Sequence, residues 1–152
     1  MIHALDQTSS KQRRQVLHLV YQSQYAQHVE LEKRDTPEES RRNARAIWRL
    51  NLADAHMHYY VYELSGRIAG YILLRELPNK TGFVDDLGVD IERRGQGIGR
   101  KLTEFAFEWA RKKQLTSMKL TTQRNNAAAA ATYLAAGFEE VPSEYIDFEK
   151  RI

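Results

Sequence analysis

Apolar residues in the first third of the chain recur at helical spacing. Between Ser9 and about His28 they return every third or fourth position, after a Ser and Thr cluster that suits a helix N-cap. A second helix is predicted to start after Thr36, because Pro37 takes the first helical position and two glutamates follow it. This helix should end near Ala55.

From residue 56 the pattern becomes that of a sheet. Segments 56–64 and 68–75 flank a Ser-Gly-Arg turn and predict a β-hairpin, and 82–89 predicts a third antiparallel strand. The expected remaining elements are a helix over 97–113, a strand over 118–122, a helix over 126–136, and strands over 138–141 and 145–152. This order predicts an α/β (α+β) fold in one domain over residues 1–152.

Composition removes several classes of function. The 152 residues contain no cysteine, which excludes thiolate catalysis and disulfides, and a net charge of +3 is too small to indicate a nucleic-acid partner. No apolar run approaches the roughly 20 residues of a membrane span, and no secretory signal is evident, so we expect a cytoplasmic protein without a membrane partner. His56 and His58 lack a third ligand at a plausible spacing, so no metal is expected.

A glycine-rich turn carries the strongest chemical signal. Arg94, Gly95, Gln96, Gly97, Ile98 and Gly99, followed by Arg100, lie between a predicted strand and an amphipathic helix. Free amides and the positive end of the helix converge there, glycines allow close approach, and arginines supply forked hydrogen bonds. The turn predicts a site for a diphosphate, although the same glycines could simply close a loop. Its spacing fits neither a P-loop nor a dinucleotide fingerprint.

The segment from Arg94 to Gly99 resembles the Gln/Arg-x-x-Gly-x-Gly/Ala signature of the GNAT family of N-acetyltransferases. Val84 to Asp90 resembles the family's fourth strand, and Asn126, Tyr133, Gly137 and Phe138 fall at the spacing of a further family signature. The resemblance extends over essentially the whole chain. It implies a mixed, mostly antiparallel sheet of about six to seven strands, flanked by about four helices and splayed between the fourth and fifth strands.

The resemblance also implies a cosubstrate, acetyl-CoA, and the residues that hold it. Amides of the 94–99 turn would bind the pyrophosphate, backbone groups of Leu87 and Val89 would bind the pantetheine as an added strand, and the acetyl carbonyl would point at the Val89 amide. Asn126 would also contact the pantetheine. Gly88, within the strand, predicts a bulge that opens a wedge for the thioester, although a glycine there could also merely relieve crowding.

Acid and base candidates follow from the chemistry of amine acetylation. The amine must lose a proton and the leaving thiolate must gain one. By resemblance, Tyr133 lies with its hydroxyl near the CoA sulfur and donates that proton. No glutamate occurs between Phe83 and Asp90, so we expect a water relay that ends on Asp85 or Asp86, which strand alternation would place on opposite faces.

These features predict an N-acetyltransferase that transfers acetyl to a primary amine of a small molecule or peptide by direct attack in a ternary complex. The alternative is a CoA-binding sensor or regulatory module with little turnover. Acidic residues at Glu30, Glu32, Asp35, Glu38 and Glu39 favour a cationic acceptor, although a helix start explains part of that cluster. The family resemblance also makes a homodimer reasonable.

Overall fold

A mixed sheet of seven strands runs through the part of the protein described by the computed structural model, residues 1–31, 33–141 and 146–152. The strand order is β1-β2-β3-β4-β5-β7-β6, and every neighbouring pair is antiparallel except the parallel pair β4 and β5. The strands are β1 (Ile2–Ala4), β2 (Met57–Leu64), β3 (Arg67–Leu77), β4 (Thr81–Val89), β5 (Ser117–Thr122), β6 (Glu139–Val141) and β7 (Ile146–Arg151).

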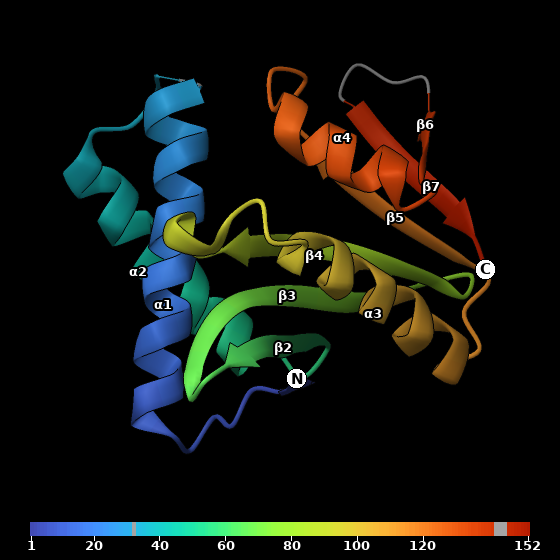
Figure 1. The fold of residues 1–152 in the computed structure, drawn as a ribbon, viewed down its shortest axis with the longest axis horizontal. Helices are drawn as coiled ribbons and strands as arrows, with labels where there is room; N and C mark the ends of the chain where they lie inside the picture. Colours follow the sequence, from blue (N-terminus) through green and yellow to red (C-terminus); the bar gives the residue numbers. More distant parts are fainter. Residues whose placement is uncertain (32, 142–145) are drawn as a thin grey trace.

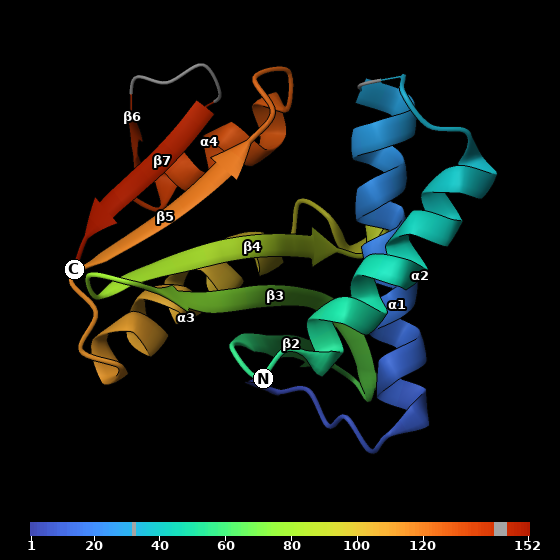
Figure 2. The ribbon, with the colours of Figure 1, turned by 180° about the vertical axis from the view of Figure 1, so that it is seen from behind.

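Helices cover both faces of this sheet. They are α1 (Ser10–Gln24), the π-helix η1 (Tyr25–Leu31), α2 (Pro37–Ala53), the 3₁₀ helix η2 (Ile91–Arg93), α3 (Ile98–Lys112) and α4 (Ala127–Ala135). Figure 1 shows α3 and α4 on the near face, and Figure 2 shows α1 and α2 across the other face beside β2 to β4. In the part of the chain that the structure describes, no helix has the length and apolar character needed to cross a bilayer.

Each face of the sheet has its own core. On one face, Leu102 and Ala106 of α3 pack with Ile72 and Leu74 of β3. On the other face, Val16 and Val20 of α1 and Trp48 of α2 pack against the same strand. Strand β3 is therefore buried on both sides, which agrees with its nearly continuous apolar sequence.

Local signals set the starts of the first two helices. Ser9 accepts a hydrogen bond from the Gln12 amide, and Thr36 and Glu39 form a reciprocal capping box at the start of α2. The helix predicted to reach His28 does continue that far, but its last part widens into the π-helix η1. Such π segments often occur at functional sites, and η1 lies against the cavity described below.

The wedge between β4 and β5 begins at an irregularity in β4. The pairing of β4 with β5 ends at Val84 and Leu120. On the other side of β4, Leu74 pairs with Val84 while Leu73 pairs with Asp86, which leaves Asp85 as an extra residue. A bulge bends its strand, so β4 turns away from β5 directly after the last paired residue, and Figure 2 shows the two strands diverging.

This bulge corrects the expectation placed on Gly88. A Cβ atom at Gly88 would lie 2.4 Å from Cε1 of the Tyr71 ring. Glycine is required there because a buried ring crosses the strand, and the bulge lies at Asp85 instead. The strand β1 was also absent from the sequence-based prediction, which otherwise agrees with the observed order of elements. The predicted start of the last strand, Tyr145, lies outside the described residues.

Candidate active site

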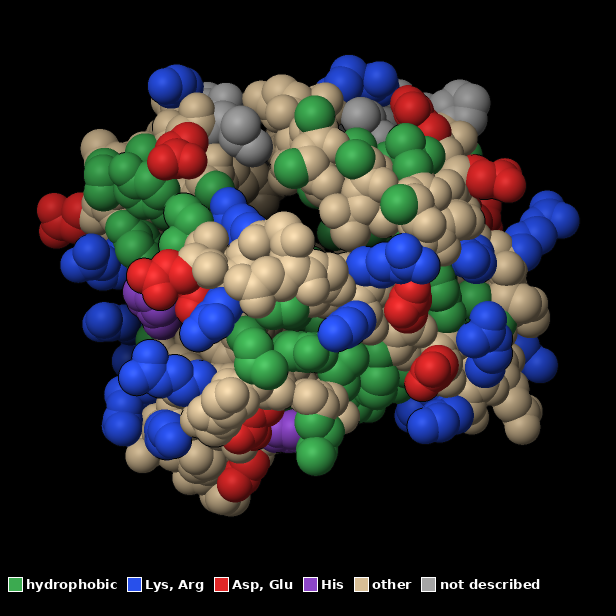
Figure 3. Space-filling view, viewed as in Figure 1, with side chains coloured by type: hydrophobic (Ala, Val, Ile, Leu, Met, Phe, Trp, Pro, Cys, Tyr) green, Lys and Arg blue, Asp and Glu red, His purple; other side chains and the backbone are tan. Residues whose placement is uncertain are grey.

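A cavity of about 610 Å³ opens where β4 leaves β5. Figure 3 shows the surface hollowed at the centre of this face, with Lys and Arg side chains on either side of the hollow. Three groups of residues line the cavity: the end of β4, the glycine turn with the start of α3, and the facing parts of α1, η1 and α4. They are Ser23, Ala26, Gln27, Glu30, Leu87, Gly88, Val89, Arg93, Arg94, Gly95, Gly97, Ile98, Gly99, Arg100, Asn126, Ala128, Ala129 and Thr132.

The glycine turn is built to face an anion. Gly95 and Gly97 have φ values of +75° and +76°, in the left-handed region that favours glycine, and a Cβ at either would meet no atom within 4 Å. Gly97 is the N-cap of α3 and has no side chain to accept hydrogen bonds from the first amides of that helix. Those amides therefore point into open space at the positive end of the helix.

Three arginines surround this turn. Arg94 donates from Nε to the Val89 carbonyl at 3.3 Å, and Arg100 forms an ion pair of 2.8 Å with Glu104 one helical turn later. Arg93 has no ion pair or side-chain hydrogen bond within the described residues. All three side chains line the cavity. Positive charge is therefore concentrated where the orphaned amides converge.

The structure brings the sequence-predicted cofactor residues together. All of them line the cavity except Gln96, which belongs to the turn but does not contact the cavity. Asn126 is the N-cap of α4 and accepts a hydrogen bond from the Ala129 amide at 3.2 Å. Its side-chain carbonyl is thus used within α4, and the residue also lines the cavity.

Asp86 lies next to this cavity, on the face covered by α1. Its Oδ2 accepts a hydrogen bond of 2.6 Å from the Tyr71 hydroxyl, and its Oδ1 lies 3.5 Å from the Ser23 hydroxyl. Burial of the carboxylate raises the pKa of Asp86 to about 6, although the bonds from Tyr71, Leu87 and Ser23 oppose the shift. Such a group can accept a proton near neutral pH.

Asp85 has a different partner from Asp86 but projects from the same face of the sheet. Arg75 donates to both of its carboxylate oxygens, at 2.8 and 2.9 Å. Arg75 belongs to the same face of β3 as Tyr71, so both aspartates project toward the side of α1 and α2. The prediction of opposite faces was wrong because the bulge at Asp85 interrupts the alternation of side chains.

Tyr133 lies on the opposite side of the wedge, within the core between α4 and the sheet. Its ring packs edge-on against Phe138, with ring centres 5.9 Å apart, and it is 9% exposed. Burial, followed by the negative charge of Asp86, raises the pKa of Tyr133 well above its usual value. The hydroxyl therefore stays protonated at neutral pH.

Sequence reasoning missed several residues of this site. Ser23 and Gln27 reach the cavity from α1 and η1, beside Glu30, which the acidic cluster in the sequence had already marked. Tyr71 reaches Asp86 from β3. Tyr71 lies in a nearly continuous apolar segment, which predicts a core residue and not a partner of a carboxylate. The three residues of the helical segment recur at i, i+4 and i+7, a spacing that marks one face but does not say what that face meets.

Comparison with known proteins agrees with this geometry. The family model described as "Acetyltransferase (GNAT) family" matches residues 18–138. A streptothricin acetyltransferase from Escherichia coli is 35% identical over 71 residues, which cover 47% of this chain and 41% of that protein. The N-alpha-acetyltransferase RimI of Mycobacterium tuberculosis is 32% identical over 99 residues, which cover 63% of this chain and 61% of that protein.

A solved structure adds a ligand to the comparison. A putative streptothricin acetyltransferase from Bacillus anthracis, determined in complex with acetyl coenzyme A, has a TM-score of 0.60 and 26% identity over 66% of this chain and 65% of that one. The two curated relatives are matched over less than two thirds of their own lengths. The family model, in contrast, covers most of the chain, including the wedge and the glycine turn. The chain therefore belongs to the acetyltransferase (GNAT) family.

Proposed function

We propose that this protein is an acetyl-CoA-dependent N-acetyltransferase that acts on a primary amine of a small molecule or peptide. The observation that carries the proposal is the continuity of one cavity from the arginine-rich turn to Ser23, Leu87 and Gly88. Ser23 and Leu87 both contact Asp86. An anion-binding end and a proton-accepting end therefore adjoin the same opening in the sheet.

The residues present fit the cosubstrate. The open glycines and unpaired first amides of α3 can hold a diphosphate, with Arg93, Arg94 and Arg100 as counter-charges. Beyond Val84 the edge of β4 is not paired with β5, so its backbone groups are available to a ligand that lies along Leu87 and Val89. When bound, acetyl-CoA supplies the thioester carbonyl that the amine attacks.

Asp86 and Tyr133 divide the proton transfers between them. The Asp86 carboxylate takes a proton from the incoming ammonium, directly or through one water, which leaves a neutral nucleophile. Tyr133 keeps its proton at neutral pH and holds it at Oη for the leaving sulfur. Asp85 is already committed to Arg75 by two hydrogen bonds, so we assign it a structural role.

The acceptor enters from the side of η1. Glu30 lines the cavity with a carboxylate that favours a cationic acceptor, and the relatives named above are enzymes for an antibiotic and for α-amino groups. Glu32, part of the acidic cluster noted in the sequence, lies outside the described residues. A primary amine that is protonated in solution is therefore the proposed acceptor class.

Calorimetric titration with acetyl-CoA tests the cosubstrate, and release of free CoA across a panel of amines tests the transfer. The Gly97→Glu variant should weaken acetyl-CoA binding because it places a negative charge in the anion site. Gln114→Glu is the matched control: Gln114 also has a positive φ, of 56°, and the same charge is added there, but this exposed residue does not line the cavity. Absence of saturable binding in the unmodified protein would refute the proposal, and binding without release would favour the sensor alternative.

A further inference from the structure

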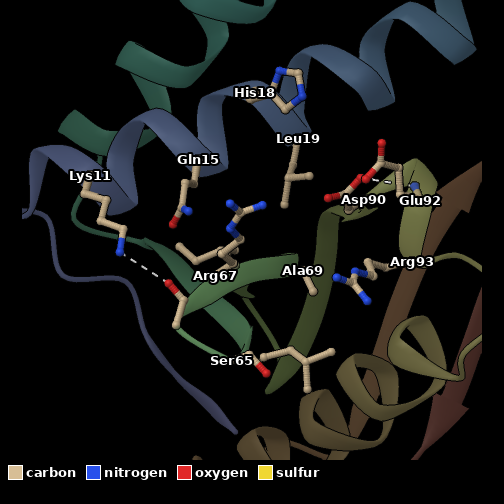
Figure 4. Close-up of a pocket in the computed structure, with 13 residues that line it drawn as sticks. Lys11, Gln15, His18, Leu19, Ser65, Arg67, Ala69, Asp90, Glu92 and Arg93 are labelled. Carbon is tan, nitrogen blue, oxygen red and sulfur yellow. Dashed lines mark hydrogen bonds between the residues drawn. The ribbon is translucent and has the colours of Figure 1, made fainter.

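A second cavity, of about 750 Å³, lies on the other side of the β4–α3 connection. Figure 4 shows it between α1, the turn that joins β2 to β3, and the segment around η2. Lys11 and Gln15 point toward it from α1, and Arg67 and Arg93 project into it from different elements. Leu19 and Ile68, which are buried in the same core, form its apolar part.

The positive charges of the two arginines in this cavity are not neutralised by an ion pair in the described part of the chain. Neither Arg67 nor Arg93 forms an ion pair or a side-chain hydrogen bond within the described ranges of the chain. Lys11 makes only a hydrogen bond of 3.3 Å to the Gly66 carbonyl, which leaves its charge unneutralised. Three cationic groups therefore share one cavity without an anionic partner in contact with them.

The two carboxylates of this cavity do not remove that imbalance. Asp90 is the N-cap of η2 and accepts a hydrogen bond from the Glu92 amide at 3.2 Å. Its own amide donates to the Ala69 carbonyl at 3.0 Å, which fixes the segment against β3. Glu92 is exposed. The acidic groups thus lie at the η2 end beside Arg93, without an ion pair to it in the described part of the chain, whereas Lys11 and Arg67 lie at the end formed by α1 and the turn.

Arg93 connects this cavity with the one assigned to acetyl-CoA. It lines both, and it immediately precedes the glycine turn. A guanidinium that is bound to an anion in one cavity cannot donate the same hydrogen bonds in the other. Occupation of the two cavities should therefore be antagonistic.

We propose that the cavity between α1 and the β2–β3 turn is a regulatory site for a small polyanion, with carboxylate or phosphate groups that contact Arg67, Lys11 and Arg93. Its occupant withdraws Arg93 from the cofactor cavity and weakens acetyl-CoA binding. The coupling, though not the anion site itself, rests on the function proposed above. By thermodynamic linkage, acetyl-CoA weakens anion binding by the same factor.

The experiment uses citrate as the carboxylate probe and inorganic phosphate as the phosphate probe, each titrated calorimetrically into the full chain at constant ionic strength. Arg67→Gln is the test variant, because Arg67 lies outside the cofactor cavity and makes no contact that folding requires. Arg13→Gln is the control, since Arg13 is an exposed cation of α1 that does not line the cavity. We expect Arg67→Gln to weaken binding of the effective probe about tenfold, whereas Arg13→Gln leaves it unchanged.

Acetyl-CoA titrations with and without the probe then measure the coupling. The probe should raise the apparent Kd of acetyl-CoA about fivefold or more in the unmodified protein and not in Arg67→Gln, whose affinity without the probe stays normal. An equal effect in both proteins would place the anion at the glycine turn and overturn the proposal, as would failure of both probes to bind. Loss of acetyl-CoA binding altogether would refute the proposed function, while the titrations without acetyl-CoA would still decide the anion site.

Discussion

The hydroxyl of Tyr71 donates a hydrogen bond of 2.6 Å to Oδ2 of Asp86. Tyr71 is fully buried, and its ring lies where a Cβ atom at Gly88 would otherwise stand. The phenol thus reaches one carboxylate oxygen from inside the core, and the other oxygen lies 3.5 Å from the hydroxyl of Ser23, which lines the cavity. This contact both orients Asp86 and opposes the rise in its pKa.

Tyr71→Phe should raise the pKa of Asp86 further, because it removes a hydrogen bond to the charged form. The acid limb of the pH profile of kcat should move to higher pH, with turnover at high pH less affected. Tyr59→Phe is the control, since Tyr59 is also buried but its hydroxyl bonds to Asn51. An unchanged profile in Tyr71→Phe would show that Tyr71 does not position the base.

Asp86→Asn should lower kcat about 100-fold or more, the usual contribution of a general base. Asp85→Asn should leave kcat within about threefold, because Asp85 is bound to Arg75 and has no proton-transfer role. Steady-state rates at saturating acetyl-CoA would compare the two variants. Equal losses in both, or a loss only in Asp85→Asn, would contradict the assignment of Asp86.

Charging Asp86 should destabilise the fold. The pKa of Asp86 is about 6 in the folded protein, above its ordinary value of 3.8. Between these two pH values the folded state binds more protons than the unfolded state, so the free energy of unfolding falls as pH rises through this window. The Asp86→Asn variant has no carboxylate to ionise at this position and does not lose stability in this way. Its Tm relative to the unmodified protein should therefore increase from pH 4 to pH 7, whereas a difference that is constant with pH would show that Asp86 is not desolvated.

Tyr133→Phe should lower kcat by about 100-fold while acetyl-CoA affinity changes little, because only the proton donor is lost. The ring contacts with Phe138 and Phe148 remain, so the unfolding midpoint should stay close to that of the unmodified protein. Calorimetry, thermal melts and rate measurements on one preparation would separate these effects. A normal kcat would leave Tyr133 as a packing residue.

Gly88→Ala should destabilise the protein by about 1–3 kcal/mol, because the added methyl group overlaps the Tyr71 ring. Gly99→Ala is its counterpart near the same cavity. There a Cβ would meet only ordinary contacts, at 3.7 Å or more, within a helical turn, so stability should be unchanged or slightly increased. Urea denaturation of both variants tests the difference, and equal midpoints would contradict it.

Features that depend on neighbouring residues in sequence were predictable. The start of α2 follows from Thr36, Pro37 and Glu39 alone, and the glycine turn follows from its own spacing. The strand β1 has only three residues and therefore no readable alternation. Its existence depends on pairing with β2, more than fifty positions later.

The environment of the two aspartates was not predictable for the same reason. Their common face depends on the register between β3 and β4, which no local pattern reveals. The ion pair of Asp85 with Arg75 spans the hairpin, and the bond of Asp86 to Tyr71 requires a ring that crosses over Gly88. Sequence reasoning located the acidic pair, but only tertiary pairing distinguished the roles of its members.

The extra residue in β4 decides how far the sheet stays closed. If Asp85 were deleted, Val84 and Asp86 would follow each other in regular alternation opposite Leu74 and Leu73, and Asp86 would keep its face. Without the bend, however, β4 could continue alongside β5 and close the opening between them. A single extra residue thus separates an ordinary continuous sheet from one with an opening between two of its central strands.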